Sequence, residues 1–124
     1  MLSGIFIENT PWIQIKVNWG ISVQTPFAIL DTGFSGDLQV TPEIAKELNL
    51  SVTGVTKATI ANGQTISVPV ALAIASLEGG SHYIQVLISD STPLAGIGLF
   101  SKFGYTAIVD CKVRDVALVK SKSE

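Results

Sequence analysis

The stretch Phe27-Ala28-Ile29-Leu30-Asp31-Thr32-Gly33-Phe34-Ser35-Gly36 decides the fold of this 124-residue chain. It places a carboxylic acid where an apolar strand runs into a turn that contains two glycines. Four consecutive apolar residues predict a strand buried on both faces, so Asp31 at its end is expected to be partly desolvated, which makes its protonation adjustable. Gly33 and Gly36 allow the backbone to approach closely enough to point amide N–H groups at the carboxylate. An active-site acid would lie in such a place.

The Asp31-Thr32-Gly33 triplet resembles the signature of aspartic proteases. Alone, it is better explained by an ordinary strand-ending turn, in which the aspartate accepts local backbone hydrogen bonds. A second stretch, Leu94-Ala95-Gly96-Ile97-Gly98-Leu99-Phe100, is similar to the second marker of that family, two hydrophobic residues and a glycine that lead into a short helix. Because both stretches occur in the family's order, the chain resembles a retropepsin-like aspartic protease of the small microbial type.

Length and composition indicate a single domain over residues 1–124, with a disordered polar tail at residues 121–124. No apolar run is long enough for a membrane helix, and the apolar start is too short for a signal peptide, so we expect a soluble, cytoplasmic protein. Cys111 is the only cysteine, which rules out an internal disulfide and fits a reducing compartment. We expect it to be a buried small hydrophobe.

The charge pattern argues against several classes of function. A net charge of −2 and eight scattered basic residues do not form the clustered basic face that nucleic acid requires. His82 and Cys111 offer no recognisable ligand spacing, so no metal site is predicted, and His82 is expected on a strand surface. The resemblance implies no organic cofactor either.

Hydrophobic patterning predicts an all-β fold, which by resemblance is a retropepsin-like closed barrel with one or two short helices. Thr41 as N-cap and Pro42 at the first helical position predict a helix ending near Asn49. The Asn62-Gly63 pair between β-forming runs predicts a hairpin turn. A second short helix is expected at 99–103, stopped by Gly104. Strands are predicted at 13–19, 27–31, 38–40, 55–60, 64–72, 82–88, 107–109 and 113–119.

Hydrolysis of peptides by carboxylates requires two of them, one ionised to take a proton from water and one protonated to polarise the scissile carbonyl. The chain has one Asp-Thr-Gly, so the second carboxylate is expected from a second copy in a C₂ dimer. Mutual repulsion in such a dyad separates its two pKa values, and activity should peak on the acid side of neutral. The other aspartates lack the glycine turn: Asp37, Asp90, Asp110 and Asp115.

The resemblance implies roles for individual residues. Asp31 would act as catalytic acid and base, while the Thr32 hydroxyl bonds across the dimer and the Gly33 amide reaches the carboxylate. Ser35 is expected to support the same loop, although Phe34 stands where better-known enzymes have a small residue. The hairpin would be the flap, which holds an extended peptide substrate against the dyad. Its tip is Ala61, Asn62 and Gly63.

Two other interpretations stay open at the level of sequence. A non-catalytic dimeric β-barrel could bind extended peptides or mediate assembly, since fold does not guarantee chemistry. A monomeric small barrel could carry the triplet by chance. The dimer interface is also open: the segments Leu2–Ile7 and Val113–Val119 could interleave between subunits, and Trp12 and Trp19 offer an alternative contact.

Overall fold

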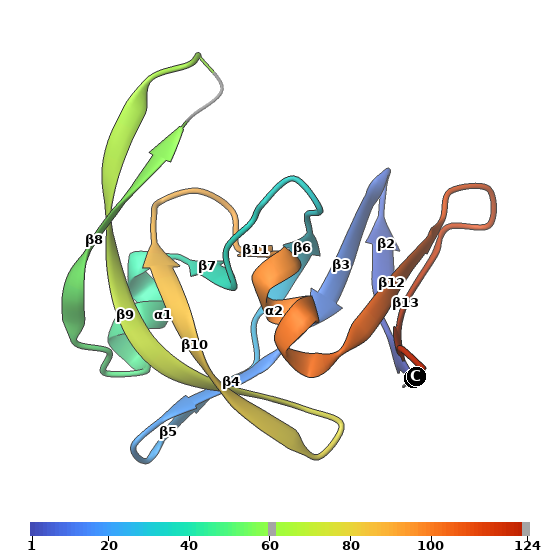
Figure 1. Ribbon diagram of the computed structural model, residues 1–124, viewed down its shortest axis with the longest axis horizontal. Helices are drawn as coiled ribbons and strands as arrows, with labels where there is room; N and C mark the ends of the chain where they lie inside the picture. Colours follow the sequence, from blue (N-terminus) through green and yellow to red (C-terminus); the bar gives the residue numbers. More distant parts are fainter. Residues whose placement is uncertain (60–61, 123–124) are drawn as a thin grey trace.

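The computed structural model describes residues 1–59 and 62–122 of the chain. Within them, strands dominate and two short helices, α1 (Pro42–Glu47) and α2 (Ile97–Phe103), accompany them, which confirms the all-β class (Figure 1). Ala61 and the last two residues of the expected tail lie outside the described residues. The strands are β1 (Leu2–Ser3), β2 (Ile5–Ile7), β3 (Thr10–Gln14), β4 (Lys16–Trp19), β5 (Ser22–Gln24), β6 (Phe27–Leu30), β7 (Leu38–Val40), β8 (Val52–Thr59), β9 (Thr65–Leu77), β10 (Gly80–Ile88), β11 (Leu94–Ala95), β12 (Tyr105–Asp110) and β13 (Asp115–Lys120).

The main sheet is curled into a half-barrel. Its strand order is β2-β3-β6-β11-β7-β10-β9-β4-β5, with β8 paired to β9. β3 and β4 are separated in sequence only by Ile15 but lie near opposite ends of this order, so the sheet must curl to bring them together. The predicted strand over 13–19 is therefore interrupted at Ile15, where the chain changes partners from β6 to β9. Its alternating burial is as predicted, because Ile13, Ile15 and Val17 are completely buried.

Local chemistry favours the start of α1 and the end of α2. The Thr41 side chain accepts a hydrogen bond from the Ile44 amide at 3.3 Å, and Pro42 occupies the first turn of α1. α2 ends where Gly104 adopts a left-handed conformation with φ +69°. It begins two residues earlier than the sequence predicts, and Leu99, Phe100 and Phe103 point from it into the core.

The core fills the concave side of the curled sheet. Each fully buried aliphatic side chain contributes about 1.5–3 kcal/mol of hydrophobic stabilisation. The prediction that 27–30 is buried on both faces was wrong: Ala28 and Leu30 are buried, but Phe27 is 41% exposed, because only one face of the curled sheet covers the core. The largest completely buried side chains include Ile13, Ile15, Leu38, Leu48, Ile84, Leu99 and Leu118.

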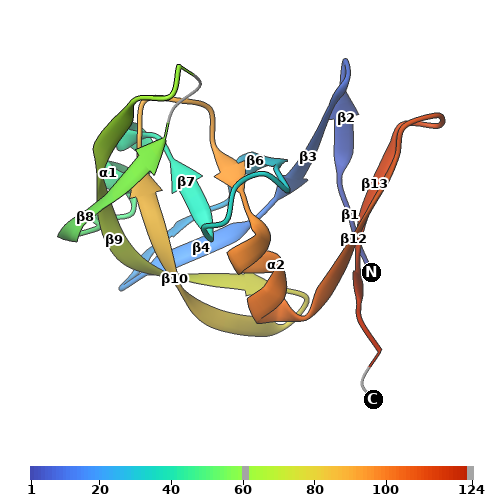
Figure 2. The same cartoon turned by 45° about the horizontal axis from the view of Figure 1, so that its top comes forward.

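A separate three-stranded sheet, the terminal sheet, has the order β1-β13-β12 and joins the two ends of the chain (Figure 2). Leu2 pairs with Leu118, so both edges of β13 are occupied within one chain, by β1 and β12. Val113, predicted to begin the last strand, lies in the turn between β12 and β13. Cys111 lies in the same turn and is exposed, so its predicted burial was wrong. A turn at the tip of a projecting hairpin has no core to enter.

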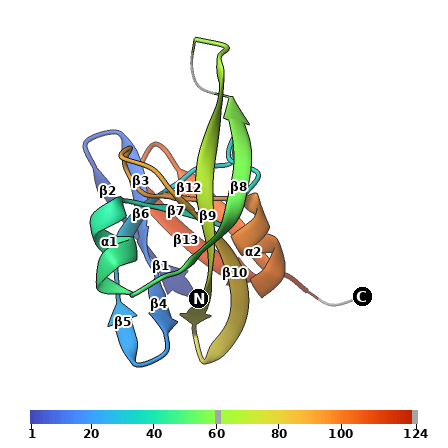
Figure 3. The same cartoon turned by 90° about the vertical axis from the view of Figure 1, so that its left-hand side faces the viewer.

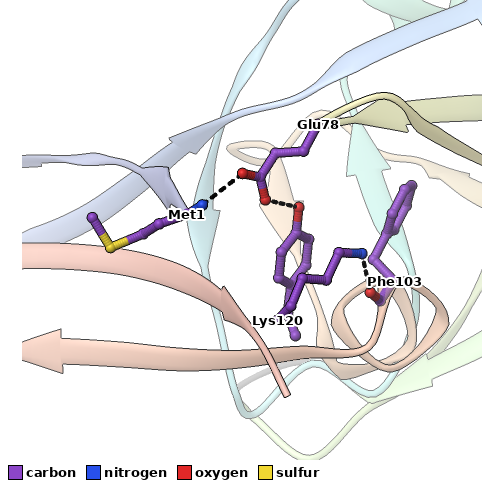
Figure 4. Close-up of polar contacts among 5 residues, drawn as sticks. Met1, Glu78, Phe103 and Lys120 are labelled. Atoms are coloured by element: carbon purple, nitrogen blue, oxygen red, sulfur yellow. Dashed lines mark hydrogen bonds and ion pairs between the residues drawn. The ribbon is translucent and has the colours of Figure 1, made fainter. Parts of the chain in front are cut away.

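A group of polar contacts fastens the terminal sheet to the turn between β9 and β10 (Figure 4). The Glu78 carboxylate accepts hydrogen bonds from the Met1 ammonium at 2.7 Å and from the Tyr105 hydroxyl at 2.6 Å. Lys120 donates to the Phe103 carbonyl, and its ammonium lies 4.5 Å from the centre of the Tyr105 ring. We call these five residues the terminal polar cluster.

Two pKa values are shifted in the terminal polar cluster. The hydrogen bond from the Met1 ammonium, aided by that from Tyr105, holds the pKa of Glu78 below its ordinary value of 4.5. Burial, together with the neighbouring Glu78 carboxylate, raises the pKa of Tyr105 far above its usual range. Both shifts favour an ionised Glu78 and a neutral Tyr105 in the folded protein.

Candidate active site

Asp31 lies directly after β6, and hydrogen bonds from neighbouring backbone groups fix its position. Its amide donates to the Ala95 carbonyl at 3.0 Å, and its carbonyl accepts from the Phe34 amide at 3.2 Å. The Gly33 amide donates to carboxylate oxygen Oδ1 at 2.9 Å. The Asp31 side chain is partly exposed, so a carboxylate with one backbone donor in place still faces solvent. We call residues 31–36 the Asp31 loop.

The second sequence marker holds the Asp31 loop by direct backbone contact. Gly96 and Gly98 are glycines because the two segments touch. A Cβ at Gly96 would lie 2.3 Å from the Gly36 carbonyl oxygen, and one at Gly98 would lie 2.3 Å from the Asp37 carboxylate. Three successive amides at the start of α2 donate to carbonyls at the end of the loop and just beyond it: Gly96 to Asp37 at 3.0 Å, Ile97 to Phe34 at 2.9 Å and Gly98 to Gly36 at 3.0 Å.

Asp37 is a buried acid that sequence reasoning did not single out as part of the site. Its Oδ2 accepts from the Gln85 amide at 2.9 Å and from the Lys102 ammonium at 2.5 Å. It therefore ties the end of the Asp31 loop to β10 and to α2. The sequence signal was weak: an aspartate between a glycine and a buried strand is visible, but its partners lie 48 and 65 residues away.

Thr32 and Ser35, the two predicted supporting hydroxyls, are exposed at the tip of the Asp31 loop. Neither side chain has a hydrogen-bond partner among the described residues. The predicted bond of Thr32 across a dimer stays a prediction, because the structure is of one chain. Phe34, between them, is turned inward and packs against Val68, Val70 and Leu87.

The β8–β9 hairpin projects beyond the body of the protein on the side of the Asp31 loop (Figures 1 and 3). Near its tip, the Asn62 side chain accepts a hydrogen bond from the Gln64 amide at 2.9 Å, and Gly63 has φ +84°. Such a turn requires glycine or asparagine, as the sequence predicted. Ala61, the third predicted tip residue, lies outside the described residues.

Two adjoining cavities separate the hairpin from the Asp31 loop. One, of about 260 Å³, is lined by Asp31, by Ala58 and Thr59 of β8, and by β9 and β10 side chains. The other, of about 420 Å³, lies between residues 33–36 of the loop and residues 56–59 of β8. Loop and hairpin thus form the two walls of one cleft, with the Asp31 carboxylate in its lining.

No protein-family model matches the sequence, and no curated protein matches it. The fold does match a solved structure, the crystal structure of a retropepsin-like aspartic protease from Rickettsia conorii. The TM-score is 0.64 over 99% of this chain and 91% of that one, with 17% sequence identity. This chain has the retropepsin-like fold. Identity this low shows the fold alone and leaves the chemistry to be argued from the site.

In this retropepsin-like chain, Asp31 is the one carboxylate among the described residues that line the cleft. The same described part contains no group of three His, Cys, Asp or Glu side chains placed to hold a metal ion. It also contains no helix that is long and apolar enough to cross a membrane. His82 is exposed on β10, where it meets the Phe103 ring edge-on at 4.6 Å.

Proposed function

We propose that this protein is an aspartic-type endopeptidase that acts as a homodimer and contributes Asp31 from each copy. One carboxylate, ionised, takes a proton from water, while the other, protonated, polarises the scissile carbonyl. The observation that carries the proposal is the position of Asp31. Its carboxylate accepts a hydrogen bond from the Gly33 amide and lines the cleft between the loop and the hairpin. The chain that contains this cleft has the retropepsin-like fold.

The need for two copies follows because Asp31 is the one carboxylate among the described residues that line the cleft. Asp37 is the nearest in sequence to the Asp31 loop, but its Oδ2 is held by the Gln85 amide and the Lys102 ammonium. The Asp110 carboxylate accepts from the Lys112 and Val113 amides in the turn that follows β12. A C₂ axis beside the Asp31 loop would supply the missing carboxylate, because isologous contact brings the same residue from both chains together.

We place the dimer contact on the terminal elements. In Figures 1 and 2, the β2–β3 and β12–β13 hairpins stand beside each other, away from the β8–β9 hairpin. They carry apolar side chains that a monomer leaves in water. β13 itself has no free edge for a partner strand, whereas β12 pairs on one side only. The Trp19 ring makes an edge-on contact with the Tyr83 ring of the same chain. The exposed apolar side chains are Ile5, Ile7, Ile108, Val109 and Val113.

Peptide cleavage by matched proteins tests the proposal. Purified wild type and Asp31→Asn are incubated with an unbiased peptide library from about pH 3.5 to 7, and the products are sequenced by mass spectrometry. We expect cleavage by the wild type alone, strongest below neutral pH, since a dyad shares one proton. Sedimentation of both proteins at micromolar concentration should show dimers.

The opposite results are equally informative. Equal cleavage by both proteins would assign the activity elsewhere in the chain or to a contaminant. No cleavage by a folded, dimeric wild type would favour a non-catalytic module that binds extended peptides. A monomer without activity would make the Asp31 loop an ordinary turn.

A further inference from the structure

The aromatic ring of Phe34 is the common wall of the two cavities. Phe34 borders the 260 Å³ cavity that contains Asp31 and also borders the adjoining 420 Å³ cavity. The other shared residues are Gly33 of the loop, Ala58 and Thr59 of β8, and Leu87 of β10, and Phe34 has the only aromatic ring among them. The ring therefore stands where the cleft would otherwise be continuous.

The position of this wall is fixed by its surroundings. The Phe34 amide donates to the Asp31 carbonyl, and its own carbonyl accepts from the Ile97 amide. A Cβ at Gly36 would lie 2.6 Å from the ring atom Cζ, and one at Gly96 would lie 2.7 Å from Cδ2. The ring thus occupies space that is available because its neighbours Gly36 and Gly96 have no side chains.

Side chains on the hairpin side of the cleft also contact Phe34. Phe34 and Ala58 pack together against Val68, Val70 and Leu87, which are all buried. These side chains come from β8, β9 and β10, so the ring connects the Asp31 loop to the base of the hairpin. A side chain packed on both sides in this way makes a rigid partition.

The two cavities offer different chemistry. Of the side chains that line only the cavity containing Asp31, Ile66, Val68 and Leu94 are aliphatic, and Gln39, Ser89 and Ser91 are polar. The side chains that line only the other cavity are all polar: Ser35, Thr56, Lys57 and Gln85. Lys57 is exposed, and its ammonium forms no ion pair or hydrogen bond with the described residues. It is a positive charge available to a ligand.

We infer that Phe34 divides the cleft into two subsites with different preferences, an apolar one beside Asp31 and a polar, carboxylate-preferring one beside Lys57. In an extended peptide, side chains two positions apart lie on the same face and about 6–7 Å from each other. One such pair would fill the two cavities from opposite sides of the ring. The inference rests on the proposed function, because it takes an extended peptide as the occupant, and it makes Phe34 a specificity-determining residue.

A binding experiment tests this division separately from catalysis. A randomised peptide library is selected for binding to the Asp31→Asn protein, which keeps the cleft but should not cleave. The same selection is made with Phe34→Ala and Phe34→Leu added to that background. Phe27→Ala is the matched control, because it removes the same ring from an exposed position on β6 that borders neither cavity. Lys57→Gln tests the charge alone.

We expect the Asp31→Asn protein to select an apolar residue at one position on the order of tenfold over a polar one. Two positions away, a carboxylate should be preferred over an ammonium about fivefold, as suits an exposed charge. Phe34→Ala should weaken both preferences together, whereas Phe34→Leu and Phe27→Ala should retain them. Lys57→Gln should abolish only the preference for a carboxylate.

Two results would overturn the inference: unchanged preferences in a folded Phe34→Ala protein, or selected peptides without paired positions. Failure of the proposed function would be recognised differently. If the selected peptides bind with the expected dependence on Phe34 but the wild-type dimer does not cleave them, the division of the cleft stands and the catalytic proposal falls.

Discussion

The Asp31 loop and the terminal polar cluster both join segments that are far apart in the chain, but they do so with different contacts. The loop is held by backbone groups in direct contact, at glycines where a Cβ would collide with a carbonyl or carboxylate oxygen. The terminal polar cluster is held by long side chains that reach from Glu78, Tyr105 and Lys120. The first kind of contact leaves no room to adjust, while the second can rearrange and respond to pH.

This difference suits the position of each region. In the proposed dyad, an acid that meets a second copy of itself has to be placed to within a fraction of an ångström, and rigid backbone contacts achieve this. A sheet that fastens the ends of the chain only has to stay attached. Substitutions should therefore be costly at the loop and mild at the terminal polar cluster.

The largest effect is expected from Gly96→Ala. Gly96 has φ −115°, which any residue can adopt, so the cost arises from collision of the new methyl with the carbonyls of Phe34 and Gly36 and with the Phe34 ring. We expect a loss of about 3 kcal/mol in the free energy of unfolding. Gly104→Ala is the opposite case, with open space but φ +69°, and should cost about 1 kcal/mol. Urea denaturation of both variants measures the difference, and equal losses would refute the steric account.

Asp37→Ala should have the next largest effect. It removes the acceptor for the Gln85 amide and for Lys102, which is partly exposed and contributes less. We expect a loss of about 2 kcal/mol, and about half of that for Asp37→Asn, which retains an oxygen for the amide. Urea denaturation gives both values. Asp90→Ala, at an exposed position, serves as control, and a loss as large as that of Asp37→Ala would contradict the prediction.

Tyr105→Phe should cost about 1 kcal/mol, because it deletes the hydroxyl that donates to Glu78 while keeping the ring under Lys120. Thermal unfolding at neutral pH is the measurement. The matched control is Tyr83→Phe, since Tyr83 is 64% exposed and its hydroxyl has no partner among the described residues. If both variants unfold at the same temperature, the hydrogen bond to Glu78 contributes nothing.

The smallest effect is the pH dependence of the terminal polar cluster. The pKa of Glu78 is lowered in the folded protein, so its contribution is fully present above the ordinary value of 4.5 and is lost as pH falls through the folded pKa. The difference in melting temperature between wild type and Glu78→Gln should be constant near neutrality and shrink below about pH 4.5. A difference that widens in acid would show that the sign is wrong.

Local chemistry explains which parts of the fold the sequence could predict. The capped start of α1 at Thr41, the stop of α2 at Gly104 and the Asn62-Gly63 turn each depend on a few adjacent residues. The alternating burial of residues 13–17 could also be predicted from the sequence. In contrast, nothing local shows that the chain changes strand partners at Ile15, because the break follows from how the whole sheet curls.

In the candidate site, too, features that depend on adjacent residues could be predicted from the sequence, and contacts between distant segments could not. Asp31 and the glycines beside it were predicted from one stretch of sequence, and the close approach of the Gly33 amide is seen in the structure. The roles of Asp37 and Phe34 were not predicted, because their partners on β10 and α2 come close to them only in the folded chain. Phe34 looked like a departure from the family pattern, yet the missing side chains of Gly36 and Gly96 accommodate it.

The pairing of β1 with β13 has a consequence for the order of events during synthesis. Leu2 can pair with Leu118 only after the residues between them have been made, so the terminal sheet cannot form on a nascent chain that still lacks β13. Contacts between distant segments also close more slowly than local ones. The half-barrel can begin to form earlier. The surface on which we place the dimer contact is thus completed after the half-barrel, and in the proposed homodimer each chain has half of the dyad until that surface has formed and met its partner.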